Sequence, residues 1–73
     1  MTYRTGQAVE VYDRNGRHSW RPAFLMRHEP YVVRGRLIAD GFYISWSDLT
    51  SEDYSNGVSA GGWTPVRDIR HCG

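Results

Sequence analysis

The 73-residue chain has one cysteine, no lysine, three prolines and no long apolar run. Because Cys72 has no second cysteine to pair with, an internal disulfide is excluded and the chain fits a reducing, cytoplasmic setting. No segment approaches the roughly 20 apolar residues of a membrane-spanning helix. The first residues also lack the apolar centre of a signal peptide. The sequence therefore predicts a cytoplasmic protein with no membrane partner.

The chain also has almost no excess of charge of one sign, because nine basic and eight acidic residues give a formal net charge of +1. All nine basic residues are arginines, which is typical of the GC-rich genome of a bacterium, phage or plasmid. Nucleic-acid binding by counterion release needs a basic excess or at least a basic face. The excess is absent here, so such a function would depend on arginines gathered on one face.

The length of the chain allows a single small domain. A domain of this size buries only about 60% of its unfolded surface, so we expect any site to lie in a groove, a loop cluster or a subunit interface. Aromatic residues make up 14% of the chain. Small β-domains fill their cores with rings, and we expect some of these rings to remain on the surface.

The first expected strand, 7–13, alternates between apolar and polar residues, which is the period of a half-buried strand. Val9 and Val11 face the expected core, and Tyr12 lies on the other face. Asn-Gly at 15–16 then predicts a tight hairpin turn, because these residues supply the positive φ that such a turn requires. The stretch 6–26 therefore predicts a first hairpin.

The second expected strand, 18–28, contains Pro22, which cannot donate a ladder hydrogen bond and predicts an edge position or a bulge. Ala23 and Leu25 share the core face of this strand. The opposite face, with Phe24, is also apolar, so we expect the strand to bend across a barrel.

A second hairpin is expected over 31–47. Residues 31–38 are β-prone but are interrupted at 34–36, and Asp-Gly at 40–41 is a turn signal. We therefore expect the turn at 39–41. The following strand, 42–47, alternates again; its expected core residues are Phe42, Ile44 and Trp46, and Tyr43 lies on the other face.

Residues 48–62 have no usable period and predict a loop that is long for a small domain. Its first part, 48–54, would form one helical turn. A short strand over 63–66 and a 3₁₀ turn over 66–70 would then lead to a final extended segment. No stretch predicts a helix of ten residues or more.

Four motifs of the chain resemble those of Tudor and Agenet domains. They are Gly6-x-x-Val9-Glu10-Val11, Trp20-x-Pro22-Ala23, Tyr43-Ile44-Ser45-Trp46 and Pro65-Val66-Arg67-Asp68-Ile69-Arg70. The resemblance implies an all-β fold, a small five-stranded SH3-like barrel with one long loop before the last strand. On this basis we expect a flexible N-terminus at 1–5, the barrel at 6–70 and a tail at 71–73. The interruption at 34–36 and the long loop depart from a compact Tudor domain.

In Tudor-type domains an aromatic cage holds a methylated lysine or arginine by cation–π attraction. By position, the resemblance assigns such a ligand-binding role to Tyr12, Trp20, Tyr43 and Trp46. The alternation of strand 42–47 instead favours a core position for Trp46, whereas Tyr12 and Tyr43 are expected on the surface. We therefore expect a non-enzymatic module that binds a protein or peptide through surface aromatics.

The alternative is a nucleic-acid-binding regulator that uses the arginines of the turns. Its expected contacts are Arg14, Arg17, Arg34 and Arg36, which would form a basic patch with interleaved rings if one rim of the fold brought them together. The competing interpretation is that these are solvated turn charges, paired with Asp13, Glu10 and Asp40. The sequence therefore leaves DNA or RNA as an alternative partner. It does not determine the oligomeric state.

Motifs for catalysis and metal binding are missing from the sequence. The soft ligands are His18, His28, His71 and Cys72, and their spacing fits no zinc site. No nucleophile stands at a recognisable spacing from a base. We therefore expect no enzymatic activity, no metal and no cofactor.

Overall fold

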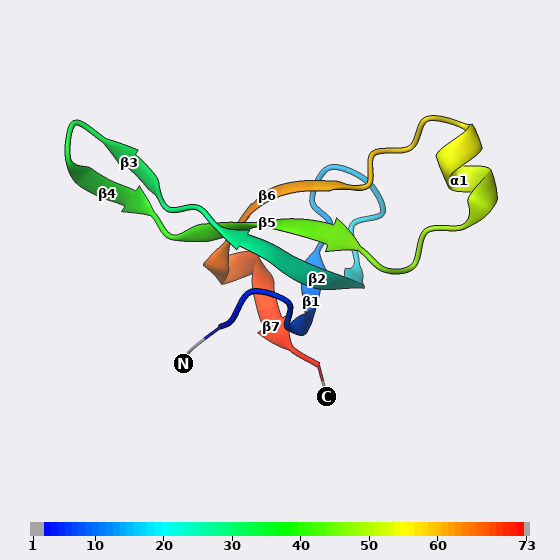
Figure 1. Cartoon of the computed structure of the whole chain (residues 1–73), viewed down its shortest axis with the longest axis horizontal. Coiled ribbons are helices and arrows are strands. Elements are labelled where there is room, and N and C mark those ends of the chain that lie inside the picture. Colours follow the sequence, from blue (N-terminus) through cyan, green and yellow to red (C-terminus); the bar gives the residue numbers. More distant parts are fainter. Residues whose placement is uncertain (1–2, 73) are drawn as a thin grey trace.

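The computed structural model describes residues 3–72, which form seven strands, one short helix and one 3₁₀ turn (Figure 1). The elements are β1 (Ala8–Tyr12), β2 (Trp20–His28), β3 (Tyr31–Val33), β4 (Arg36–Ala39), β5 (Gly41–Trp46), α1 (Ser51–Ser55), β6 (Gly61–Pro65), η1 (Val66–Asp68) and β7 (Ile69–His71). A five-stranded antiparallel sheet has the order β6-β5-β2-β1-β7, and β3 and β4 form a separate two-stranded sheet.

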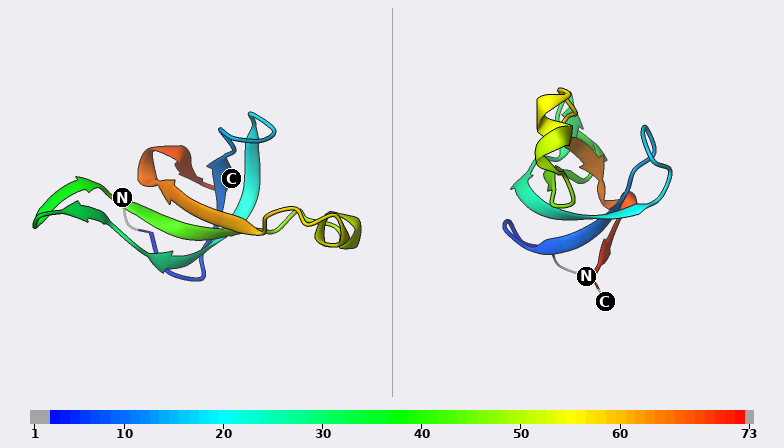
Figure 2. Two further views of the ribbon diagram at one scale, coloured as in Figure 1. Left: turned by 90° about the horizontal axis from the view of Figure 1, so that it is seen from above. Right: turned by 90° about the vertical axis from the view of Figure 1, so that its right-hand side faces the viewer.

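The all-β prediction is confirmed, but the expected number of five strands is wrong. The larger sheet curls around the core, as the two turned views show (Figure 2). Within residues 3–72 its edge strands, β6 and β7, do not pair with each other, so the sheet does not close into a barrel. One additional strand arises because residues 31–38, which the sequence predicts as one interrupted strand, form both β3 and β4. The other is β7, where the sequence predicts only a final extended segment.

The predicted turn of the second hairpin at 39–41 is wrong, because the chain reverses at Arg34 and Gly35. These two residues have φ values of 51° and 77°, and two-residue hairpin turns of this kind require positive φ at both central positions. Gly41 instead belongs to β5 and lies opposite Pro65 of β6. The strands β3 and β4 with their turn, residues 31–39, are called the arm; they project from one end of the molecule (Figures 1 and 2).

The first hairpin is confirmed, but its connection is wider than the predicted tight turn. The backbone N–H of Asp13 donates to the carbonyl of Ser19 at 2.9 Å, and the positive φ falls on His18, at 53°, rather than on Gly16. The Asp13 carboxylate accepts the backbone N–H of Arg17 at 2.9 Å. This side-chain bond stabilises a longer loop, which is why the Asn-Gly signal does not set the turn.

The predicted edge position of Pro22 is also wrong, since β2 is the central strand of the larger sheet. Pro22 lies opposite Glu10 of β1, whereas pairing with β5 begins one residue later, at Ala23. The carbonyl of Pro22 still accepts the N–H of Ser47 at 3.1 Å. The missing N–H therefore falls at the end of the β2–β5 ladder, where a central strand tolerates it. A bulge does occur in β2, but between Leu25 and Arg27.

Six of the seven predicted core residues are buried, Trp46 is half-buried, and Ile69 is a buried residue that the sequence did not assign to the core. The buried core residues are Val9, Val11, Ala23, Leu25, Phe42, Ile44 and Ile69. Trp46 and Tyr3 pack against this cluster from its margin, and the Tyr3 hydroxyl donates to the carbonyl of Ile69 at 3.2 Å. Of the expected flexible N-terminus and tail, residues 1–2 and 73 lie outside the described part of the chain.

The expected helical turn near 48–54 is present as α1, which a capping box holds at its start. The Thr50 side chain accepts the N–H of Asp53, and the Asp53 side chain accepts the N–H of Thr50. Both bonds satisfy N–H groups that the helix cannot pair. In residues 3–72, no helix has the length and apolar character needed to span a bilayer.

Candidate aromatic cleft at the root of the arm

Two of the four residues expected to line an aromatic cage, Tyr12 and Trp20, do lie together. They face each other across β1 and β2, with ring centroids 5.6 Å apart in an edge-to-face arrangement. The guanidinium of Arg14 lies 5.2 Å from the centroid of Tyr12, and that of Arg70 lies 4.1 Å from the centroid of Trp20. These cation–π contacts already occupy ring faces that a cationic ligand would need.

Of the other two expected cage residues, Trp46 borders the same concave surface as Tyr12, whereas Tyr43 lies elsewhere. Tyr43 is exposed on β5, opposite Trp63 of β6. Trp46 packs against the core, with the Arg21 guanidinium 4.1 Å from its ring centroid. Neither Trp20 nor Tyr43 lines the surface that Tyr12 and Trp46 share, so the fold does not bring all four residues around one space.

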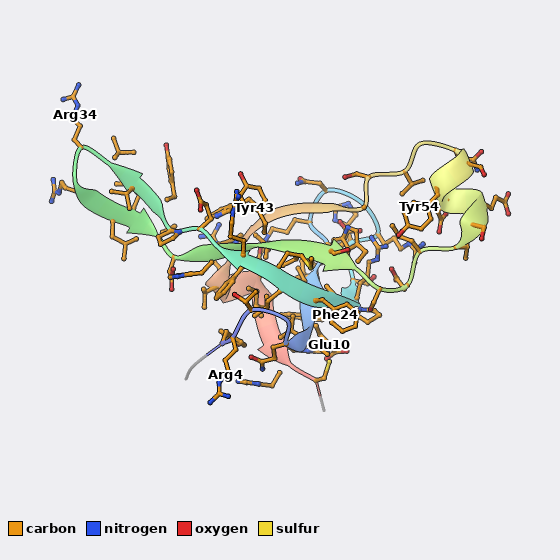
Figure 3. The ribbon with its side chains drawn as sticks, viewed as in Figure 1. Arg4, Glu10, Phe24, Arg34, Tyr43 and Tyr54 are labelled. Carbon is orange, nitrogen blue, oxygen red and sulfur yellow. The ribbon has the colours of Figure 1, made fainter. Side chains whose placement is uncertain are left out.

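The four arginines of the nucleic-acid alternative are also separated. Arg14 binds Asp68 through two bonds of 2.8 and 2.7 Å, and Arg17 binds Asp48 at 3.3 Å. Arg34 lies at the tip of the arm, away from the first turn (Figure 3), and Arg36 is the first residue of β4, directly after the turn of the arm. The first pair is therefore neutralised by aspartates, although these are not the partners that the sequence suggested.

Arg21 links the first turn to the end of β5, and only 7% of its surface is exposed. It donates to both carboxylate oxygens of Asp48, at 3.1 and 2.8 Å, and to Asp13 at 2.8 Å. The Arg21 hydrogen bonds lower the pKa of Asp48 despite its partial burial. Burial raises the pKa of Asp13, but hydrogen bonds from Arg17 and Arg21 outweigh it and lower that pKa overall. The three side chains form a structural ion cluster.

A concave cleft of about 580 Å³ lies beside this cluster, between the first turn and β6. Its floor includes Val11, Ile44 and Trp46. The charged groups beside them, Arg21 and Asp68, are already bound to partners within the chain. These charged groups stabilise the fold, and their hydrogen-bonding positions are taken by partners within the chain.

A second cleft, of about 530 Å³, lies where the arm meets the larger sheet. Its lining is Glu29, Pro30, Tyr31, Val32, Tyr43 and Trp63, and it is called the arm-root cleft below. Three rings from β3, β5 and β6 border it, and each of them is exposed. Tyr43 is visible near the base of the arm in Figure 3.

The indole of Trp63 is fixed in this cleft by two contacts. Its Nε1 donates to the carbonyl of Glu29 at 2.7 Å. Its ring lies against Gly41, where an added Cβ would come within 2.4 Å of the indole. Gly41 is therefore needed for the close approach of ring and backbone, and the indole forms a rigid wall.

A charged pair lies at the rim of the arm-root cleft. The guanidinium of Arg27 lies 4.7 Å from the centroid of Tyr43, and its Nε is 3.6 Å from the Glu29 carboxylate. Both charged side chains are largely exposed. Aromatic faces beside a carboxylate suit an apolar or a cationic side chain of a partner.

Sequence reasoning missed two of the three rings, Tyr31 and Trp63. The sequence places both residues in expected strands, 31–38 and 63–66, and gives neither of them a binding role. One feature of the sequence could have indicated the arm. The residues on both sides of 34–36 are apolar without the alternation of a half-buried strand. Such a run fits a hairpin with no core of its own.

Residues 3–72 hold no group of three or more histidine, cysteine or acidic side chains placed to bind a metal ion. No protein-family model matches the chain, and no curated protein or solved structure matches it either.

Proposed function

We propose that this protein is a non-enzymatic module that binds a protein or peptide through the arm-root cleft. The observation that carries the proposal is the convergence of Tyr31, Tyr43 and Trp63 on one cleft next to Glu29. Rigid tyrosine and tryptophan side chains supply large contact areas at low entropic cost, and they dominate many interfaces. The near-neutral net charge also fits a protein partner better than a polyanion.

We further propose an SH3-like domain of the Tudor or Agenet type. Support comes from the order β6-β5-β2-β1-β7 and from the 3₁₀ turn directly before the last strand, together with the four sequence motifs. The ligand surface that we propose differs from the cage implied by the resemblance. It keeps Tyr43 but replaces Tyr12, Trp20 and Trp46 with Tyr31 and Trp63.

Peptides selected from a random display library against the wild-type protein provide the test. The double variant Tyr31→Ala with Tyr43→Ala is expected to bind the selected peptides at least about 30-fold more weakly, because aromatic anchors of interfaces each contribute about 2 kcal/mol or more. Tyr54→Ala is the matched control, since Tyr54 is about as exposed as Tyr31 but lies on α1 at the other end of the molecule (Figure 3). Equal affinity of all three proteins would contradict the proposal.

Nucleic-acid binding makes a separate prediction. Fluorescently labelled single- and double-stranded DNA and RNA of about 20 nucleotides are expected to show no saturable binding at about 150 mM salt, because Arg14 and Arg17 are bound to aspartates. Fluorescence anisotropy over a salt series measures this. If binding is tight, falls log-linearly with salt and is lost in Arg34→Ala with Arg36→Ala, the nucleic-acid function replaces the proposal.

A further inference from the structure

The chain contains two Asn-Gly pairs, Asn15-Gly16 in the first turn and Asn56-Gly57 directly after α1. A glycine after asparagine favours attack of the main-chain nitrogen on the asparagine side chain, because glycine has no Cβ to hinder the approach. All four residues are exposed, so exposure does not distinguish the two pairs. They differ in how firmly their surroundings hold the main chain.

The first pair is fixed by the ion cluster of Arg21. A Cβ added to Gly16 would lie 2.6 Å from Oδ2 of Asp13, so this glycine lies directly against the carboxylate. The same carboxylate accepts the N–H of Arg17 at 2.9 Å and a guanidinium N–H of Arg21 at 2.8 Å. The backbone N–H of Gly16 also donates to it. Rotation of the main chain between Asn15 and Gly16 would therefore disturb a partly buried group of charges.

The second pair lies at the end of α1, a helix with no buried residue that projects at the end of the molecule opposite the arm (Figure 1). The N–H of Gly57 donates to the carbonyl of Tyr54 at 3.1 Å. A Cβ added to Gly57 would meet nothing within 4 Å, so no neighbouring group restrains this glycine. Segments with exposed backbone hydrogen bonds and few buried contacts open at a low cost in free energy. The main chain at Asn56 can therefore rotate without opening the core.

We infer that Asn56 is a site of spontaneous deamidation in the folded protein, and that the fold protects Asn15 from the same reaction. The main-chain nitrogen of Gly57 forms a bond to the side-chain carbonyl carbon of Asn56. The bond from that carbon to the side-chain nitrogen breaks, and the NH₂ group leaves as ammonia with the amide proton of Gly57. Water then opens the cyclic imide at either of its two carbonyl carbons, which gives aspartate or isoaspartate. Water is the only other reactant.

The Asp13 carboxylate opposes the first step of this reaction at Gly16. The attacking nitrogen must lose its proton, and both the hydrogen bond to the carboxylate and the negative charge beside it disfavour that loss. The carboxylate is also a weak base at neutral pH, because its pKa lies below the ordinary value of 3.8. The N–H of Gly57 donates instead to an uncharged carbonyl, which opposes the loss of a proton less strongly.

Deamidation of Asn56 changes the end of α1. It places a negative charge at the C-terminal end of a helix, where the macrodipole disfavours it. Isoaspartate also lengthens the main chain by one carbon at the residue that caps the helix. The segment 48–62 already has three acidic residues and no basic residue. Modified chains should therefore lose α1 and keep the core.

Peptide mapping by mass spectrometry, after incubation of the protein at mildly alkaline pH, tests the inference. In the folded protein, Asn56 is expected to exchange ammonia for water at least about tenfold faster than Asn15, since only its segment opens readily. Incubation in concentrated urea is the control. Both pairs are then unfolded, and their rates should agree within about twofold.

The variant Arg21→Met tests the protection of Asn15 separately. Loss of the guanidinium loosens the ion cluster, so the rate at Asn15 should rise several-fold while the rate at Asn56 stays unchanged. In the isolated deamidated fraction, the amide of Tyr54, which donates to the carbonyl of Thr50 at 3.2 Å, should exchange faster. The amide of Leu25, bonded to the carbonyl of Gln7 at 3.0 Å, should not change.

Three outcomes would overturn the inference. Equal rates at the two asparagines of the folded protein, or a faster rate at Asn15, would show that the ion cluster gives no protection. A difference that persists unchanged in urea would assign it to neighbouring residues in the sequence rather than to the fold. Reaction of both asparagines in urea and of neither in the folded protein would show that α1 does not open.

Discussion

Replacement of Arg21 by methionine is expected to lower the free energy of unfolding by about 3–5 kcal/mol, the usual cost of removing one partner from a buried ion pair. The methionine keeps much of the apolar stem over Trp46 but leaves Asp13 and Asp48 without the guanidinium. A chain of this length has a total stability of roughly 4–11 kcal/mol at typical values per residue. Urea denaturation followed by tryptophan fluorescence should therefore show a large loss of the folded state.

Arg17→Ala is the matched control, because Arg17 binds the same Asp48 from the solvent side. Its side chain is 55% exposed and its contact with Asp48 is 3.3 Å long, so removal should cost at most about 1 kcal/mol. Equal losses for Arg17→Ala and Arg21→Met would show that burial of the cluster adds nothing. A neutral Arg21→Met variant would contradict the structural role of Arg21 directly.

Acid should reduce the difference between wild type and Arg21→Met. The folded pKa values of Asp13 and Asp48 lie below their ordinary value of 3.8, so their contribution to stability is present above that value and is lost as the pH falls through the lower folded values. Once the carboxylates are protonated, Arg21 has little to stabilise. Urea titrations should show nearly the same difference at about pH 6 and 4 and a smaller one at about pH 2.5. A constant difference would assign the effect to packing against Trp46.

The elements that the sequence predicted well are those in which side-chain alternation reports burial. Val9 and Val11 of β1, Ala23 and Leu25 of β2, and the alternation around Ile44 were placed correctly because each strand has one face on the core. This pattern is local and strong. The 3₁₀ turn expected over 66–70 is present over Val66–Asp68, and the final extended segment forms β7.

The arm escaped prediction because it has no buried face. Without alternation, the position of the turn rested on local turn signals alone, and Asp-Gly at 40–41 is a stronger signal than Arg-Gly at 34–35. The fold overrides that preference because β4 continues the β2–β5 hairpin, and Gly41 is held opposite Pro65. The arm-root cleft depends on this long-range geometry, so it could not be read from spacing.

The ion cluster of Arg21 could not be predicted from the sequence for a related reason. Its carboxylates come from the first turn and from the end of β5, and their approach depends on how β2 pairs with both neighbouring strands. An arginine between Trp20 and Pro22 looks like an ordinary surface charge in the sequence. Only the observation that it shares a strand face with Ala23 and Leu25 indicates that it is buried and must be paired.

The second large effect is expected from Gly61→Ala, at the start of β6. A Cβ at this position would lie 1.9 Å from the carbonyl oxygen of Ile44 and 3.1 Å from the Cα of Ser45. Both are backbone atoms of the paired strand, so no side-chain rotation can relieve the overlap. Overpacking usually costs about 1–3 kcal/mol, and because β6 must move as a whole we expect a loss of about 3 kcal/mol or more in urea denaturation.

The neighbouring Gly62→Ala provides the control, because a Cβ there meets nothing within 4 Å, and its stability should stay within about 0.5 kcal/mol of wild type. Amide exchange of Trp46 reports the local effect, since its N–H donates to the carbonyl of Ala60 at 2.8 Å, directly before β6. In Gly61→Ala this amide should exchange faster, and the selected peptides should bind more weakly because Trp63 moves with β6. Equal stability of Gly61→Ala and Gly62→Ala would show that β6 does not pack as closely on β5 as the structure has it. The position of Trp63, which β6 sets in the arm-root cleft, would then be wrong as well.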